Sequence, residues 1–416
     1  MNKDTCKGFL AGLLSCVLIF VLIACGGKED ENRLTKKNKT SSALTPGAEL
    51  TPAASLTETG YQEKLDRIAA VLDYYYYQDI DYNKVADGIY HGAVSGVGDP
   101  YTVYFNPDEY SSFQESSDGM YAGFGSRVQI GDNGYPLLTQ VFAGGPADKV
   151  GILTGDYIIE IDGEDVYGME LDLVASKMRG QVGTYVEVTI YREGEPDYLT
   201  FRVKRDIVEI PTVETEMLEN GIGYIKVSEF DEVTATQFND AVKKMTKEGM
   251  KALIVDLRGN PGGLLSTVQS MLSRILPKGD LLVYMEDKNG KREDHYSNSS
   301  LTVDVPIAVL MNGYSASASE VFAGCLQDYG KATLVGTQSY GKGIVQTMYP
   351  LGDGSAIKVT ISAYYTPKGR NIHKTGLTPD VMVELDESLR KMNSIPLDQD
   401  NQVKAAVEVL LPKISK

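Results

Sequence analysis

The sequence predicts an α/β protein of several domains, and three observations indicate this fold class. From about residue 210 to residue 386, short apolar runs typical of buried strands alternate with amphipathic runs of helical period. Residues 118–206 instead contain several short strands and one helix, separated by glycine-rich turns. Residues 59–117 show mainly helical periodicity. A chain of 416 residues is long enough for about two to three such domains.

The first 24 residues have the features of a signal peptide. Lys3 and Lys7 supply positive charge, and residues 9–24 form an apolar run that is short for a membrane-spanning helix. Residues 22–26 read LIACG, which resembles the lipobox of bacterial lipoproteins. The resemblance implies cleavage before Cys25 and attachment of lipid to its thiol. A plain signal anchor with an incidental cysteine is the alternative.

Residues 25–58 are polar, first charged and then rich in Ser, Thr, Ala and Pro. Such a composition buries too little apolar surface to fold and is typical of a flexible tether. Helical periodicity begins at Tyr61, and a second helix is predicted over residues 85–97. We expect one side of the tyrosine run at residues 74–77 to pack against the core.

Residues 118–206 form the second predicted unit. Residues 121–125 read YAGFG before a strand, a helix is predicted over 171–178, and an alternating strand over 186–192. This order resembles a PDZ domain, which binds a peptide's terminal carboxylate through backbone N–H groups and adds the peptide as an edge strand. The resemblance places the binding loop at Gly123, Phe124 and Gly125, although a simple glycine turn is the alternative. By the same analogy Arg179 couples this domain to the active site, while a surface arginine fits equally well.

Residues 207–386 are predicted to form the α/β core. Strands are expected over 224–227, 252–255, 305–310 and 355–364, and helices over 234–247 and 264–276. The tail at residues 387–416 contains a final helix over 402–411, expected to pack on the N-terminal helices or on a second subunit.

Three segments of this core carry groups suited to nucleophilic catalysis. They read DLRGNPGG (256–263), NGYSASASE (312–320) and SYGKGIVQ (339–346). A serine hydroxyl needs a base to take its proton, and lysine can serve without histidine. The glycines let backbone N–H groups approach a substrate closely. Taken singly, Ser317 to Glu320 is also a capping box, and Gly-Lys-Gly is also a turn.

Together these segments resemble the C-terminal processing peptidases, the tail-specific Ser/Lys endopeptidases of the S41 type. The resemblance implies that Ser317 is the nucleophile, Lys342 the general base and Gln346 the residue that orients the base. To act as a base, Lys342 must be neutral, so burial has to lower its pKa to roughly 7–8. If residues 343–346 form a strand, Lys342 and Gln346 lie on one face.

The resemblance also implies an oxyanion hole and a fold for the core. The backbone N–H of Ala318 would donate together with that of Gly262 or Gly263, and the sequence does not choose between the two glycines. The helix that starts at Ser317 would point its first N–H groups at the reaction centre. The core would adopt a crotonase-like ββα arrangement, and the reaction would need no cofactor.

Composition restricts the partners. With 57 acidic and 40 basic residues the formal charge is −17, which argues against binding of nucleic acid or electrostatic attachment to anionic lipid. After signal removal and lipidation of Cys25, Cys325 would remain alone, so no disulfide is expected. We expect Cys325 to be buried in a helix. The three histidines share no metal-ligand spacing, so no metal site is expected.

The sequence therefore predicts a lipid-anchored, extracytoplasmic serine endopeptidase that cleaves disordered C-terminal tails. The PDZ-like unit would control substrate access, and a homodimer is a further expectation. One alternative is an inactive envelope lipoprotein that binds peptide tails. A remote alternative is a penicillin-recognising enzyme, suggested by Ser339-x-x-Lys342 and by Lys374-Thr-Gly376. Against it, Ser339 lies in a glycine turn instead of opening a helix, and the two motifs are too close together.

Overall fold

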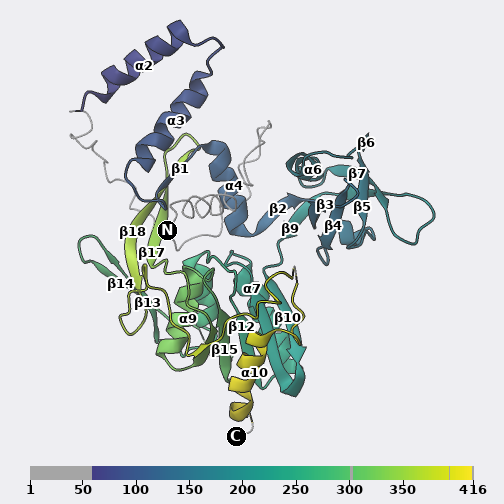
Figure 1. Cartoon of the computed structure of the whole chain (residues 1–416), viewed down its shortest axis with the longest axis vertical. Helices are drawn as coiled ribbons and strands as arrows, with labels where there is room; N and C mark the ends of the chain where they lie inside the picture. Colours follow the sequence, from purple (N-terminus) through teal and green to yellow (C-terminus); the bar gives the residue numbers. More distant parts are fainter. Residues whose placement is uncertain (1–58, 300–302, 393, 415–416) are drawn as a thin grey trace, which may run out of the picture.

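The structure, a computed structural model, describes residues 59–299, 303–392 and 394–414. The predicted signal peptide, Cys25 and the tether lie outside the described residues. Along the chain come a helical N-terminal region, a small β domain set apart from the rest, and a large α/β body (Figure 1). In the described part of the chain, no helix combines the length and the apolar character needed to cross a membrane.

The N-terminal region contains α2 (Tyr61–Tyr75), α3 (Tyr82–Ser95), β1 (Val103–Phe105) and α4 (Pro107–Asp118). Neither α2 nor α3 contains a buried residue. The expectation that the tyrosine run packs on the core is wrong, because residues 74–77 are 48% to 84% exposed. The physical reason is that α2 lies away from the body and meets no surface on which to bury them (Figure 1).

A two-stranded antiparallel ribbon, β2 (Met120–Gly123) with β9 (Asp206–Glu209), leads into and out of the small β domain. Its sheet has the order β3-β4-β5-β7-β8, with β6 beside β5. The strands are β3 (Ser126–Ile130), β4 (Pro136–Val141), β5 (Tyr157–Ile161), β6 (Glu164–Asp165), β7 (Tyr185–Tyr191) and β8 (Leu199–Lys204). The helices α5 (Pro146–Lys149) and α6 (Leu171–Met178) complete the domain around a core that includes Phe124, Leu138 and Val188.

The body is built on a sheet of order β10-β11-β12-β15-β16-β19, in which only the β10–β11 pair is antiparallel. Its strands are β10 (Val213–Leu218), β11 (Ile222–Val227), β12 (Ala252–Asp256), β15 (Ile307–Met311), β16 (Ala332–Gly336) and β19 (Val381–Met382), with the short η1 (Glu219–Gly221) between β10 and β11. Every residue of β12 and β15 is buried. A parallel strand covered on both faces needs such a continuous apolar run.

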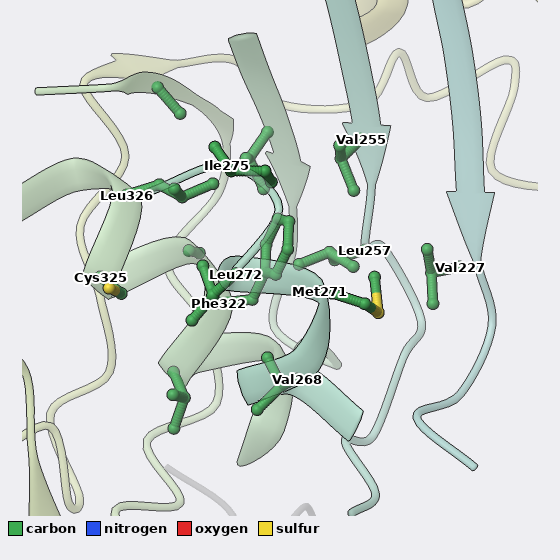
Figure 2. Packing of buried hydrophobic residues seen from close by; sticks show 14 of the residues in the cluster. Val227, Val255, Leu257, Val268, Met271, Leu272, Ile275, Phe322, Cys325 and Leu326 are labelled. Carbon is green, nitrogen blue, oxygen red and sulfur yellow. The ribbon is translucent and has the colours of Figure 1, made fainter. Parts of the chain in front are cut away.

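Helices cover both faces of this sheet. On one face lie α7 (Thr234–Lys247), α8 (Leu265–Leu272) and α9 (Ala318–Asp328), whose apolar side chains share one core. Figure 2 shows the part of this core around Leu272 of α8 and Phe322 of α9. Cys325 of α9 is fully buried there, as predicted. On the other face, α10 (Asn401–Ile414) packs Val403 and Leu410 against the strands. The expectation that this helix packs on the N-terminal helices is therefore wrong, because the second face of the sheet must itself be covered.

A second sheet joins the N-terminal region to the body. It has the order β1-β18-β13-β14, with β17 also paired to β18, and all its pairs are antiparallel. Its strands beyond β1 are β13 (Leu281–Asp287), β14 (Arg292–Tyr296), β17 (Ile344–Pro350) and β18 (Ala356–Tyr365). Because β1 pairs with β18, residues 103–105 belong to the body, although they lie within the predicted helical region.

Candidate active site

The turn that carries the predicted nucleophile, called the nucleophile turn, lies between the end of β15 and the start of α9. Ser317 is the residue just before α9, and its φ of 56° is rare for a non-glycine residue, as often found at functional sites. The neighbouring serines are buried and engaged: Ser315 Oγ donates to the Leu257 carbonyl (2.8 Å) and Ser319 Oγ to the Asn260 carbonyl (3.0 Å). Of the three serines, Ser317 is the one that reaches the surface.

A buried carboxylate, Glu320, connects this turn to the turn at residues 339–343, which contains Lys342 and is called the lysine turn. Its Oε2 accepts the backbone N–H of Ser317 (2.9 Å) and that of Lys342 (2.8 Å). Its Oε1 accepts the N–H of Gly341 (2.7 Å) and the hydroxyl of Ser339 (2.5 Å). The bond to Ser317 is the glutamate half of the predicted capping box. The sequence pattern did not indicate the other bonds, because their partners lie about twenty residues further along the chain.

Tyr364 of β18 connects the same two turns from another side. Its hydroxyl lies within hydrogen-bond distance of the carbonyl oxygens of Ser317 (2.9 Å) and Lys342. Burial, with a smaller contribution from the Glu320 charge, raises the pKa of Tyr364 well above its ordinary value. The phenol therefore stays protonated and remains a donor. The sequence analysis assigned no role to this tyrosine.

Lys342 is held in a confined environment. Burial and, secondarily, the positive charge of Lys358 lower the pKa of Lys342, while Asp99 and Glu320 act in the opposite direction. Its Nζ lies 4.6 Å from the centroid of the Tyr101 ring. Burial, and after it a hydrogen bond with the Tyr340 hydroxyl, raise the pKa of Tyr101 to about 12. The pKa of Lys342 is thus shifted in the direction that its predicted role as a base requires.

The glycines on either side of Lys342 are required by close backbone contacts. A Cβ on Gly341 would lie 2.9 Å from the Gly376 nitrogen, and one on Gly343 would lie 2.6 Å from the His373 nitrogen. Gly341 also has a φ of 91°. A side chain at either position would displace the lysine turn from the nucleophile turn.

The glycine loop after β12 lies against the nucleophile turn. A Cβ on Gly262 would lie 2.8 Å from Ser317 Cβ and 3.0 Å from the Ala318 nitrogen. The Gly262 N–H is already donated to the Asn260 side chain at 2.8 Å. The N–H groups of Gly263 and Ala318, by contrast, have no acceptor among the residues that the structure describes. The hydrogen bonding therefore leaves Gly263, and not Gly262, with a donor available to a substrate.

Gln346 lies in β17, next to the site. Its Nε2 is 3.3 Å from Thr360 Oγ1 and 3.4 Å from the Ile344 carbonyl oxygen. The strand begins only at Ile344, and its register shifts between Val345 and Gln346, so simple alternation does not relate Gln346 to Lys342. Within the described part of the chain no hydrogen bond joins the two side chains. The orienting role of Gln346 stays a prediction.

The predicted peptide loop of the small β domain opens onto a cavity of about 310 Å³. Phe124, Phe142 and Met178 line it from this domain, and Glu229 and Asp231 line it from the body. The N–H groups of Phe124 and Gly125 find no acceptor in the described residues, as a carboxylate-binding loop requires. Arg179, at the end of α6, lies 5.2 Å from the Tyr121 ring centroid and 3.5 Å from Glu115 of α4, so it connects this domain to the N-terminal region.

A larger cavity of about 770 Å³ lies at the carboxyl ends of the parallel strands, on the α10 side. Several of the charged groups that line it pair with one another: Arg258 contacts Asp256 at 2.6 Å and Asp400 at 2.8 Å. The Tyr224 hydroxyl donates to Asp256 at 2.7 Å. These bonds connect the start of α10 to the glycine loop. The charged side chains at this cavity therefore have a structural role.

The geometry argues against the penicillin-recognising alternative. Ser339 is buried, donates to Glu320 and accepts the Leu377 N–H at 2.7 Å. It follows a strand and opens no helix. Its hydroxyl is therefore engaged within the fold and is not presented to a substrate.

Comparison with known proteins places the chain in a family. The model of peptidase family S41 matches residues 221–383, and that of the PDZ domain matches residues 138–192. The chain belongs to the carboxy-terminal processing proteases of family S41. It is 32% identical over 390 residues to the carboxy-terminal processing protease CtpB of Bacillus subtilis. This alignment covers 92% of this chain and 80% of CtpB. The chain is 35% identical over 325 residues to CtpA of the same organism, covering 78% of this chain and 69% of the relative.

A solved structure agrees at the level of fold alone. It is that of a Bacteroides fragilis protein assigned to the S41 proteases, with a TM-score of 0.50, 17% identity, and coverage of 80% of this chain and 91% of that one. The protein is thus a serine protease of the C-terminal processing type, and its small β domain is a PDZ domain. The predicted family, fold class and enzyme class are confirmed.

Proposed function

We propose that this protease cleaves unstructured C-terminal regions of extracytoplasmic polypeptides through a Ser317–Lys342 dyad. The observation that carries the proposal is the Glu320 carboxylate, which binds the backbone N–H groups of both residues and so fixes one turn relative to the other. The lowered pKa of Lys342 supports the role of base.

In the proposed reaction, neutral Lys342 takes the proton of the Ser317 hydroxyl as its oxygen attacks the scissile carbonyl carbon. The negative charge that develops on the carbonyl oxygen is stabilised by the N–H of Ala318, at the start of α9, and by the N–H of Gly263, in the glycine loop after β12. The protonated lysine then gives its proton to the leaving amine, and an acyl-enzyme remains. Lys342, neutral again, activates the water that hydrolyses the ester.

The PDZ domain would capture the tail and control its access to the site. The N–H groups of Phe124 and Gly125 would bind the terminal carboxylate, and the tail would add as a strand beside β3. The peptide cavity is partly walled by Glu229 and Asp231 of the body, so an occupied groove contacts both domains. Arg179 contacts Glu115 of α4 and would transmit the position of the PDZ domain to the N-terminal region.

Location and assembly complete the proposal. Residues 22–26 support cleavage before Cys25 and a lipid anchor on the outer side of a bacterial cell membrane. The exposed apolar side chains of α2, among them Ile68, Val71 and Tyr75, support a homodimer in which α2 and α3 pack on a second copy.

The test is cleavage of a disordered, C-terminally tagged polypeptide by the chain from Cys25 onward. Wild type is compared with Ser317→Ala and Lys342→Ala, and Ser111→Ala, an exposed serine of α4, is the matched control. We expect the wild type and the control to cleave and the first two variants to be inactive. Full activity of either dyad variant would contradict the proposed mechanism.

If neither the wild type nor any variant cleaves the polypeptide, the assay is repeated with a protein in which a short turn between β2 and β9 replaces residues 124–205. Cleavage then would identify a protease held closed by its PDZ domain. Continued inactivity would favour the alternative of an inactive envelope lipoprotein that binds peptide tails.

A further inference from the structure

Among the residues that the structure describes, Lys358 is a half-buried cation without a counter-ion. Its Nζ, on β18, lies 5.3 Å from the ring centroid of Phe105 and 5.2 Å from that of Phe113. Within the described residues it forms no ion pair and no hydrogen bond to another side chain. Burial lowers the pKa of Lys358. Removing an ammonium group from water without an anionic partner is costly, so a function in the site would explain its presence.

The pairing of β1 with β18 places Lys358 near Lys342. Lys358 is directly opposite Val103, so the two side chains project from the same face of the sheet. Phe105 lies two residues beyond Val103 and shares that face. Tyr101, two residues before Val103, supplies the ring on which the Lys342 ammonium lies. Lys358 thus pairs with the strand that directly follows Tyr101, and its positive charge acts on Lys342.

We propose that Lys358 is a positioning residue which keeps Lys342 in its neutral, proton-accepting form. The inference rests on the proposed role of Lys342 as the base. Two ammonium groups that are close together in a poorly solvated place repel each other, so the pair does not readily hold both protons. Both lysines lie beside aromatic rings that favour their charged forms, Lys358 beside Phe105 and Phe113 and Lys342 beside Tyr101. They differ because the Lys358 charge lowers the pKa of Lys342, whereas burial alone lowers the pKa of Lys358. Lys342, the member of the pair beside the nucleophile turn, is then the one that stays neutral.

The other charged and titratable groups around Lys342 define why this repulsion is needed. Asp99, before β1, and Glu320, in α9, each favour the protonated lysine. Tyr340 interacts in turn with Tyr101, and His373 with Asp99. Asp99 already accepts from the Tyr101 N–H (3.1 Å) and the Thr102 hydroxyl (2.7 Å). Glu320 accepts the bonds described above. Lys342 forms no ion pair with either carboxylate in the described part of the chain, and Lys358 offsets the attraction that remains.

The test is the pH dependence of kcat/KM for the full chain acting on one tagged polypeptide. Lys358→Met removes the charge and keeps an apolar stem, whereas Lys358→Arg keeps a permanent charge. In the wild type, kcat/KM should rise with pH as Lys342 loses its proton, and this rise is called the acid limb. In Lys358→Met we expect the acid limb to move to higher pH by about one pH unit or more. At pH values below the limb, kcat/KM should fall about tenfold for each pH unit that the limb moves. The alkaline plateau should remain close to that of the wild type. Lys358→Arg should not raise the limb.

A second measurement follows the nucleophile directly. The rate at which a fluorophosphonate labels Ser317 is measured over the same pH range, which requires no peptide binding. Lys244→Met, an exposed lysine of α7, is the matched control and should leave both profiles unchanged. If Lys358→Met fails to fold, judged by thermal unfolding, Lys358→Gln takes its place.

An acid limb that stays in place without Lys358 would overturn the inference, and so would an equal loss at every pH, which indicates a merely structural role. Failure of the proposed dyad gives a different result, because Ser317→Ala would then still cleave the substrate.

Discussion

Glu320 accepts hydrogen bonds from the nucleophile turn and from the lysine turn, and it is only 1% exposed. Each of its carboxylate oxygens serves two donors. A buried carboxylate is stable in such a place only while those donors surround it. The position of Ser317 relative to Lys342 therefore depends on a side chain that does not itself take part in the proposed proton transfers.

Replacing Glu320 with Gln should disrupt this arrangement. The amide nitrogen of glutamine is a donor, and it would face N–H groups that are donors too. We expect a loss of about 3 kcal/mol in the free energy of unfolding, with a large fall in kcat. Urea unfolding and steady-state kinetics measure the two effects. Near-normal stability and kcat in Glu320→Gln would show that the carboxylate is dispensable.

The glycine loop gives a second prediction at this scale. Gly262→Ala places a Cβ 2.8 Å from Ser317 Cβ at a φ of 111°, so Ser317 must move. We expect a loss of about 100-fold or more in kcat. The matched control is Gly259→Ala, whose new Cβ meets no atom within 4 Å although φ is 78°. It should cost only about 1–2 kcal/mol of stability and little activity. Equal activity of the two variants would contradict the steric argument.

The assignment of Ser317, Lys342 and the glycine loop to one catalytic site stays a prediction, and the contacts between their turns could not be predicted from the sequence. Ser317, Lys342 and the glycine loop lie together because each follows a strand of a predictable core. The preference for Gly263 over Gly262 depends on where Asn260 points, and the role of Glu320 depends on a turn about twenty residues away. Such contacts between distant segments leave no periodic signal in the chain.

Among the elements, β1 shows why short strands escape prediction. Its three residues, Val103–Phe105, are too few for a period of two to be recognised, and they stand among helical segments. Longer elements were predicted closely: α7 is observed at Thr234–Lys247, the expected range. The pairing partner of β1 lies more than 250 residues away, at Lys358. That pairing makes the N-terminal region part of the lysine environment.

The helix α2 should contribute little to the stability of one chain. Because it has no buried residue, removing the chain before residue 80 should leave the melting temperature of the body nearly unchanged. If α2 pairs with a second copy as proposed, sedimentation should show that the truncated protein is a monomer and the longer one a dimer. A large loss of thermal stability in a protein that was already monomeric would mean that α2 packs on its own body.

At the scale of the whole molecule, the PDZ domain and the body meet at Asp231. This residue is 5% exposed, lines the peptide cavity and lies against Gly119 at the end of α4. The next residue toward the N-terminus, Phe230, donates its N–H to the Gly262 carbonyl at 2.9 Å. The wall of the peptide cavity is therefore continuous with the glycine loop of the active site.

Asp231 should make the stability of this junction depend on pH. Burial, and then the Glu229 charge, raise its pKa to about 7 from an unfolded value of about 3.9. Between these values the folded state binds more protons than the unfolded state, so stability falls as pH rises from about 4 to about 7. Asp231→Asn should therefore raise the urea midpoint relative to wild type more at pH 8 than at pH 5. An equal change at both pH values would exclude a raised pKa as the cause.

The ribbon of β2 and β9 has a consequence for how such proteases diversify. Because the PDZ domain enters and leaves the body through two adjacent, paired strands, its insertion interrupts none of the pairings of the two catalytic sheets. Another recognition domain whose ends lie equally close together could be spliced between Gly123 and Asp206, with the chemistry left as it is. Selection can then change which tails are captured without changing how they are cut, so that target choice and bond cleavage behave as separately inherited modules.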